Sequence, residues 1–84
     1  MYLHLGSDVI IKKSDIVGIF ELDGKMTSSG VRDYLRTAEK KGDLISAGYD
    51  LPKSFVIVKN GDKETVYLSH ISVSSLIKRC ALPF

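Results

Sequence analysis

Short apolar runs separated by turn-forming residues mark the first part of the chain. Residues 2–5, 9–11 and 16–20 are rich in leucine, isoleucine and valine, and glycine, serine, aspartate and lysine stand between them. Runs of β-branched and aromatic side chains bounded in this way are typical of strands. Gly18 interrupts the third run, which indicates a bulge or a close approach of another backbone segment.

A different period begins at residue 27 and predicts an amphipathic helix. Its apolar stripe, at the spacing i, i+3, i+4 and i+7, consists of Val31, Tyr34, Leu35 and Ala38. Thr27, Ser28 or Ser29 can cap the first turn, and Gly42 stands where a left-handed cap would end the helix. A short strand is expected next, over residues 44–47.

The second half of the chain predicts a hairpin and a closing helix. Residues 54–58 and 65–68 form β-branched runs that flank Asn60-Gly61, a pair that accepts the positive φ angles of a type I′ turn. Ser72 can cap the final helix. The apolar face of that helix consists of Val73, Leu76, Ile77 and Cys80.

Together these elements predict an α+β fold: a small, curved antiparallel sheet with one amphipathic helix inserted midway and a short C-terminal helix. The runs at 9–11 and 16–20 are apolar at consecutive positions, which indicates burial on both faces. Two helices, one of them short, do not suffice to cover both faces of the sheet. A second copy of the chain is the simplest cover, so we expect a homo-oligomer.

Length and composition narrow the class of protein. The chain of 84 residues suffices for one domain, residues 1–84, and its hydrophobic fraction of 44% excludes disorder. No apolar run reaches the ~18 residues of a membrane span, and the first residues lack the pattern of a signal peptide. A single cysteine forms no internal disulfide. We therefore expect a cytoplasmic protein that does not engage a membrane.

Candidate catalytic and metal-binding groups are sparse. One cysteine and two histidines give no zinc-ligand spacing, the glycines follow no phosphate-binding pattern, and no serine stands in a nucleophile-elbow motif. We therefore expect neither an enzyme nor a bound cofactor, metal or small-molecule substrate. The net charge of +2 permits binding to nucleic acid only if the charge is clustered, or repeated in an assembly.

Three lysines in predicted loops are candidates for such a surface. Lys12 and Lys13 occupy the connection between two predicted strands, and Lys53 follows Asp50-Leu51-Pro52, a segment with strong turn chemistry. The plain interpretation is that these are solvated turns, with Tyr49 packed on the sheet. The functional interpretation makes the lysines phosphate contacts, and the two can hold together.

A second group of cations lies on the predicted midway helix. Arg32, Arg36 and Lys40 recur at i, i+4 and i+8, opposite the apolar stripe. A solvated helix face, a phosphate-facing ridge and inter-subunit ion pairs all fit this spacing. The first turn of this helix lacks the asparagine, glutamine or arginine that would read bases, so insertion of the helix into the major groove is not expected.

Six segments spread over nearly the whole chain carry a resemblance to a known family. They are residues 2–6, 16–20, 38–42, 51–54, 71–72 and 76–79. In this order they resemble the RemA/RemB extracellular-matrix regulator family of small bacterial proteins, and the RemB side more than the RemA side. The resemblance implies a ring-like homo-oligomer. From RemA it also implies a DNA-binding activator of biofilm-matrix genes, with arginines that present a basic surface on the ring.

This sequence departs from the RemA pattern where RemA carries its basic residues. The place of two adjacent arginines here reads Asp50-Leu51-Pro52-Lys53, and a further basic position of RemA falls near Ser14 or Asp15. The remaining candidate DNA contacts are Lys12, Lys13 and Lys53, with Arg32 and Arg36 in reserve. Lysine is a point charge and does not copy the two-pronged contact of arginine to phosphate or guanine.

The resemblance, together with the three lysines in predicted loops, implies a homo-oligomeric transcriptional regulator that contacts the phosphates of double-stranded DNA through lysine-bearing loops. Its target genes, those of the extracellular matrix or biofilm, follow from the resemblance. The alternative is an oligomeric protein-interaction scaffold without DNA affinity. The missing arginine pair and the low net charge favour that alternative.

Overall fold

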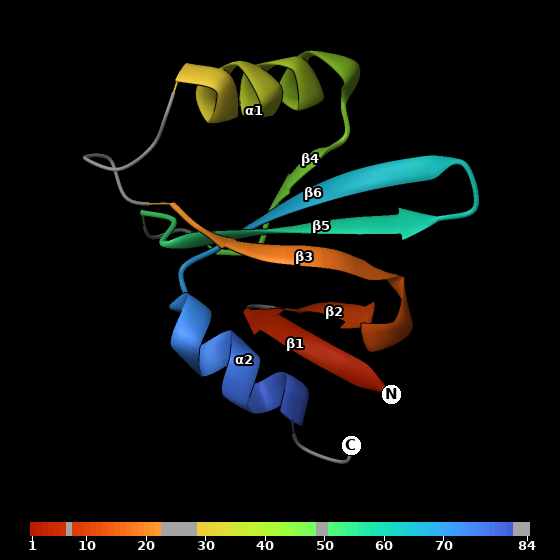
Figure 1. Cartoon of the computed structure of the whole chain (residues 1–84), viewed down its shortest axis with the longest axis vertical. Helices are drawn as coiled ribbons and strands as arrows, with labels where there is room; N and C mark the ends of the chain where they lie inside the picture. Colours follow the sequence, from red (N-terminus) through yellow and green to blue (C-terminus); the bar gives the residue numbers. More distant parts are fainter. Residues whose placement is uncertain (7, 23–28, 49–50, 82–84) are drawn as a thin grey trace.

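The elements of the chain form three layers (Figure 1). The computed structural model describes residues 1–6, 8–22, 29–48 and 51–81. The elements in chain order are β1 (Tyr2–Gly6), β2 (Val9–Lys12), the 3-10 turn η1 (Lys13–Asp15), β3 (Ile16–Glu21), α1 (Ser29–Lys41), β4 (Leu44–Ser46), β5 (Ser54–Asn60), β6 (Lys63–Ser69) and α2 (Val73–Ala81). Helix α1 covers one face of the main sheet, and the β1–β2 hairpin lies with α2 on the other. The expected caps Thr27 and Ser28 and the turn residues Tyr49 and Asp50 lie outside the described residues.

The α+β class is confirmed, although the sheet differs in one pairing from the antiparallel sheet expected. The main sheet has four strands in the order β3-β5-β6-β4, and β1 and β2 form a separate antiparallel pair. Strand β4 runs parallel to β6, whereas β5 is antiparallel to both β3 and β6. The second strand of the β5–β6 hairpin, not the first, lies beside β4. Because β6 runs opposite to β5 and in the same direction as β4, this pairing is parallel.

The predicted irregularity at Gly18 is a bulge. Ile16 pairs with Val58 and Gly18 with the next residue, Ile57, so Val17 is the extra residue of β3. The bulge turns the Val17 side chain outward, where it is 61% exposed. An added residue of this kind bends an edge strand and disrupts its ladder locally.

The β5–β6 hairpin is confirmed, but its turn lies one residue later than expected. Asn60 pairs with Lys63, so the central residues are Gly61, with a φ of +62°, and Asp62. The observed register places Ile57 opposite Val66. A turn centred on Asn60-Gly61 would instead place Glu64 opposite Ile57, so burial of apolar pairs decides the register.

Each face of the main sheet has its own apolar core. Toward the hairpin and α2, the buried residues are Leu3, Leu5, Ile11, Ala47, Val56, Val58 and Leu76, and toward α1 they are Ala38, Phe55 and Val66. Alternate residues of β5 therefore serve opposite cores. Within one chain the runs at residues 9–11 and 16–20 are covered on one side only, since Ile10 is 60% exposed and Val17 is turned out by the bulge, so their cover by a second copy stays a prediction. The β1–β2 hairpin packs only its inner side on the main sheet, which leaves Ile10 uncovered.

Helix α1 ends, and helix α2 begins, with the cap that the sequence predicts. Gly42 adopts a φ of +78°, its N–H donates to Glu39 O at 3.1 Å, and the N–H of Asp43 donates to Ala38 O at 2.9 Å. These two bonds satisfy carbonyls at the end of α1 that would otherwise lack a partner. At the start of α2, the Ser72 hydroxyl accepts the N–H of Ser75 at 3.3 Å.

A polar contact joins α1 to the main sheet. The Tyr34 hydroxyl donates to Glu64 Oε2 on β6 at 2.7 Å. The pKa of Tyr34 is raised from 10.0 to about 12. The largest cause is burial of the ring, and the hydrogen bond to Glu64 and the negative charge of that carboxylate add to it. The folded protein therefore retains the Tyr34 proton at a pH where the unfolded chain releases it.

Because of the Tyr34–Glu64 contact, we expect the folded protein to lose stability in alkaline solution. The contribution is complete below the unfolded pKa of 10.0 and disappears as the pH rises through about 12, because the unfolded state ionises first. Tyr34→Phe should lower the free energy of unfolding by about 1 kcal/mol near neutral pH and flatten its decline above about pH 10. Urea denaturation over this pH range measures both effects. Tyr2→Phe, at an exposed tyrosine, is the control. An unchanged alkaline decline in Tyr34→Phe would contradict the assignment.

Candidate nucleic-acid interface

Lys12 and Lys13 are neighbours in sequence but have different surroundings. Lys12 ends β2 and is exposed, whereas Lys13 opens η1 and is half-buried. The Lys13 ammonium donates to the carbonyl oxygen of Cys80, in the last turn of α2, at 3.1 Å. A cation at this position complements the negative end of the helix dipole. Lys13 therefore has a structural role that the sequence did not indicate, and Lys12 is the better placed of the two to meet a partner.

The loop before β5 is a corner whose backbone is fixed and whose lysine is exposed. The N–H of Lys53 donates to Ser69 O at 2.8 Å, and its carbonyl accepts the N–H of Leu22 at 2.9 Å. These bonds hold Lys53 between β3 and the end of β6. Its side chain remains exposed, next to an exposed Leu51. The structural and functional interpretations of this loop are thus compatible.

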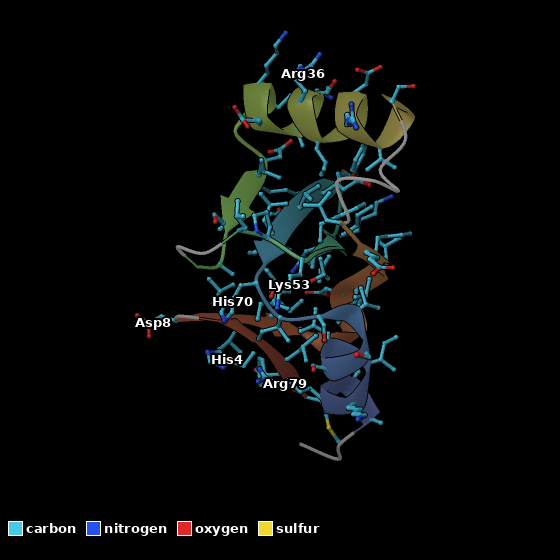
Figure 2. All side chains as sticks on the ribbon, turned by 90° about the vertical axis from the view of Figure 1, so that its left-hand side faces the viewer. His4, Asp8, Arg36, Lys53, His70 and Arg79 are labelled. Atoms are coloured by element: carbon cyan, nitrogen blue, oxygen red, sulfur yellow. The ribbon has the colours of Figure 1, made fainter. Side chains whose placement is uncertain are left out.

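Arg32 and Arg36 lie on the exposed side of α1. Arg36 Nη1 is 3.8 Å from Asp33 Oδ1, and both side chains are largely exposed, so this ion pair contributes little to stability. Figure 2 shows Arg36 at the end of the molecule farthest from Arg79. Both arginines of α1 border a shallow groove of about 360 Å³ whose apolar wall includes Leu35 and Leu44.

The structure does not bring the five predicted cations together. Lys53 precedes Ser54, which pairs with Glu21 at one end of the β3–β5 ladder. Lys12 and Lys13 precede Ile16, at the other end, roughly 15 Å away at about 3.3 Å per residue. Arg32 and Arg36 belong to the helical layer above the sheet. One chain therefore presents three separate basic sites.

Arg79 is a basic residue whose placement the sequence missed. Its Nη1 donates to the carbonyl oxygen of His4 at 3.0 Å, so the guanidinium lies against β1. In the view of Figure 2, His70 lies between Lys53 above and His4 below, with Arg79 beside His4. Arg79 lies in the last turn of α2, and no local pattern connects residues 75 positions apart.

His70 is a packing residue whose ring lies against Gly6 of β1 and Gly48. A Cβ added to Gly6 would lie 2.7 Å from its ring, and one added to Gly48 would lie 2.8 Å from its Nδ1. The φ of +125° at Gly6 also excludes most side chains. The buried Nδ1 of His70 has no hydrogen-bond partner among the described residues.

Lys63 is a second basic residue that the sequence missed. Lys12 and Lys63 border the same groove, of about 320 Å³, between the β1–β2 hairpin and the turn end of the β5–β6 hairpin. In the sequence, Lys63 is only one more polar residue beside a turn. The pairing of Lys63 with Asn60 places it near Lys12, which belongs to a distant part of the chain.

The part of the chain that the structure describes contains no group of three or more histidine, cysteine, aspartate or glutamate side chains able to hold a metal ion. Within the same residues, no helix is both long and apolar enough to cross a membrane. The candidate interface consists of exposed cations: Lys12, Lys53, Arg32, Arg36 and Arg79.

The different roles of Lys12 and Lys13 lead to a stability prediction. Lys13→Ala should lower the free energy of unfolding by about 1 kcal/mol, since it removes a charged donor from the end of α2. Lys12→Ala removes the same charge from an exposed position and should change stability by less than about 0.5 kcal/mol. Thermal or urea denaturation compares the two variants. Equal losses of stability would show that the Lys13–Cys80 hydrogen bond does not stabilise the fold.

Comparison with known proteins places the chain in a family. The model of the RemA-like family, described as extracellular matrix regulatory protein A-like, matches residues 2–80. Extracellular matrix regulatory protein B of Bacillus subtilis (strain 168) is 34% identical over 84 residues, which are 100% of this chain and 95% of that protein. These two matches confirm the resemblance of the sequence to the RemA/RemB family. The chain therefore belongs to the RemA-like family of extracellular matrix regulatory proteins.

Proposed function

We propose that this chain is a regulator of extracellular-matrix genes that assembles from several copies and binds double-stranded DNA through exposed cations. The observation that carries the proposal is the match along the full chain to a protein named as an extracellular matrix regulator. A regulatory role agrees with the expectation of a non-enzymatic protein. The relative supports the regulatory role, and the surface of this chain supports the two physical properties.

The exposed cations support binding to DNA. Lys12, Lys53 and Arg32 have no carboxylate partner among the described residues, so their charges are available to phosphates. Lys13 is the weaker candidate because it already binds the end of α2. Contacts of this kind neutralise phosphates and release counterions, and their number determines how steeply affinity falls with salt. One chain offers few such contacts, and several copies multiply them.

Exposed apolar side chains at both edges of the main sheet support assembly. Val17 and Phe20 are 61% and 42% exposed on β3, and Ile45 is 41% exposed on β4. These strands are the two ends of the sheet order. If the β3 edge of one copy meets the β4 edge of the next, the contact is head-to-tail. Contacts of this type close into rings or extend into filaments.

DNA binding is tested by the salt dependence of affinity. Fluorescence anisotropy of a labelled AT-rich duplex should show log affinity falling against log salt with a slope of several units. Replacement of Lys12, Lys53 and Arg32 together by alanine should reduce this slope by about one unit for each phosphate that is no longer neutralised. The triple variant Lys40→Ala, Lys41→Ala, Lys59→Ala has the same net charge and should retain most of the wild-type slope. An equal reduction of the slope in both variants would contradict the proposed DNA contacts.

Head-to-tail assembly is tested by mixing two variants. Light scattering should give a multiple of the 9.3 kDa chain mass for the wild type, whereas Val17→Asp and Ile45→Asp should each be monomeric. Mixed together, the two variants should form a dimer, because each retains the edge that is disrupted in the other. Ser14→Asp, at an exposed polar position, should assemble normally. Failure of the mixture to form a dimer would contradict the head-to-tail arrangement.

A protein-interaction scaffold without DNA affinity is the second candidate. The observation that favours it is an apolar groove of about 360 Å³ between α1 and the exposed edge of the sheet. Its lining includes Phe20 and Phe55, whose rings stack with centroids 5.0 Å apart, and Val31 of α1. Apolar surface of this kind suits a protein partner better than a phosphate backbone. Absence of DNA binding at low salt, with assembly intact, would favour the scaffold.

A further inference from the structure

The groove shared by Lys12 and Lys63 has the dimensions of a small-molecule site. This hairpin groove, of about 320 Å³, lies between Tyr2, Ile10 and Lys12 of the β1–β2 hairpin and Lys63, Thr65 and Tyr67 of β6. Small-molecule binding sites in proteins have volumes of about 300 Å³ or more. The residues from β6 alternate along the strand and therefore share the face turned toward β1 and β2.

The hairpin groove offers more hydrogen-bond donors than acceptors. The ammonium groups of Lys12 and Lys63 and the hydroxyl of Tyr67 have no hydrogen-bond or ion-pair partner among the described residues. The only carboxylate among the described residues that line it is Asp15, and the side-chain amide of Asn60 donates to its Oδ2 at 3.4 Å. Two cations against one partly satisfied carboxylate leave a net positive charge. The groove is therefore complementary to an anion.

The walls of the groove suit a flat apolar group. Tyr2, which is 58% exposed, and Ile10, which is 60% exposed, both contribute to the lining of the groove. Ile11 and Val58 form a buried apolar base. A planar ring that contacts Tyr2 would cover such surface, and bases stack readily on aromatic side chains. Inorganic phosphate would satisfy the lysines but would leave these walls uncovered.

We propose that the hairpin groove binds a free mononucleotide, with the phosphate between Lys12 and Lys63 and the base against Tyr2. Lysine ammonium groups form charge-assisted hydrogen bonds with phosphoryl oxygens. The remaining acceptor capacity of Asp15 is available to an amino or hydroxyl group of the nucleotide. Because Lys12 is also a proposed DNA contact, an occupied groove would compete with DNA for that side chain. The ligand would thereby regulate the protein without being a substrate.

The test measures binding of AMP, GMP, CMP and UMP by calorimetry, with adenosine and inorganic phosphate as partial probes. At least one nucleotide should bind, and each partial probe should bind about tenfold more weakly or worse. Lys63→Ala and Tyr2→Ala should each weaken the nucleotide about tenfold. Lys59→Ala is the matched control. It removes the same charge from the same hairpin, but Lys59 faces the α1 side with Ile57. It should leave affinity unchanged.

Three results would overturn the proposal: no saturable binding of any of the four nucleotides at millimolar concentration, equal weakening by Lys63→Ala and Lys59→Ala, or phosphate binding as tight as nucleotide binding. A DNA arm distinguishes free nucleotide from duplex as the source of phosphate. Lys63→Ala should weaken the nucleotide while leaving duplex affinity unchanged. If Lys63→Ala weakens only the duplex, the groove belongs to the DNA surface. The nucleotide proposal then fails while the proposed DNA function stands.

Discussion

Two buried serine hydroxyls hold the layers of this molecule together. The Ser69 hydroxyl at the end of β6 donates to Leu5 O at 2.7 Å, and the Ser54 hydroxyl at the start of β5 donates to Ile71 O at 2.7 Å. The β1–β2 hairpin is a separate sheet, so within the described part of the chain no backbone ladder joins it to the main sheet. The bond from Ser69 therefore fixes the position of the C-terminal end of β1 relative to the main sheet. Its loss would leave the buried Leu5 carbonyl without this donor, which costs more than the bond itself contributes.

The same junction determines where the charged side chains can be. Ser69 O also accepts the N–H of Lys53, and the His70 ring fills the space beside Gly6 that a Cβ would otherwise occupy. Lys53 thus projects from a rigid corner, and its position relative to β1 follows from buried hydrogen bonds. Arg79 reaches the carbonyl of His4 from α2 across the same region. The basic surface on this side is therefore a consequence of how the layers are joined.

Local sequence patterns predicted most of the elements, since each depends on neighbouring residues. The stripe of α1, the bulge at Gly18 and the cap at Gly42 all follow from spacing or from backbone preference. The turn of the hairpin was displaced by one residue because cross-strand burial of Ile57 and Val66 decides the register. The groove shared by Lys12 and Lys63 left no local signal, since it arises only when the two hairpins pack together.

In the proposed function, the spacing of the cations links assembly to DNA binding. Lys12 and Lys53 lie at opposite ends of a ladder roughly 15 Å long, which exceeds the screening length of about 10 Å at 0.1 M salt. At that distance the two charges would act on phosphates almost independently, so under the proposed function one chain with a net charge of +2 would hold DNA only weakly. Repetition of the chain along a duplex adds such weak contacts without any change in the monomer. The exposed edges of β3 and β4 are the surfaces through which this repetition can arise.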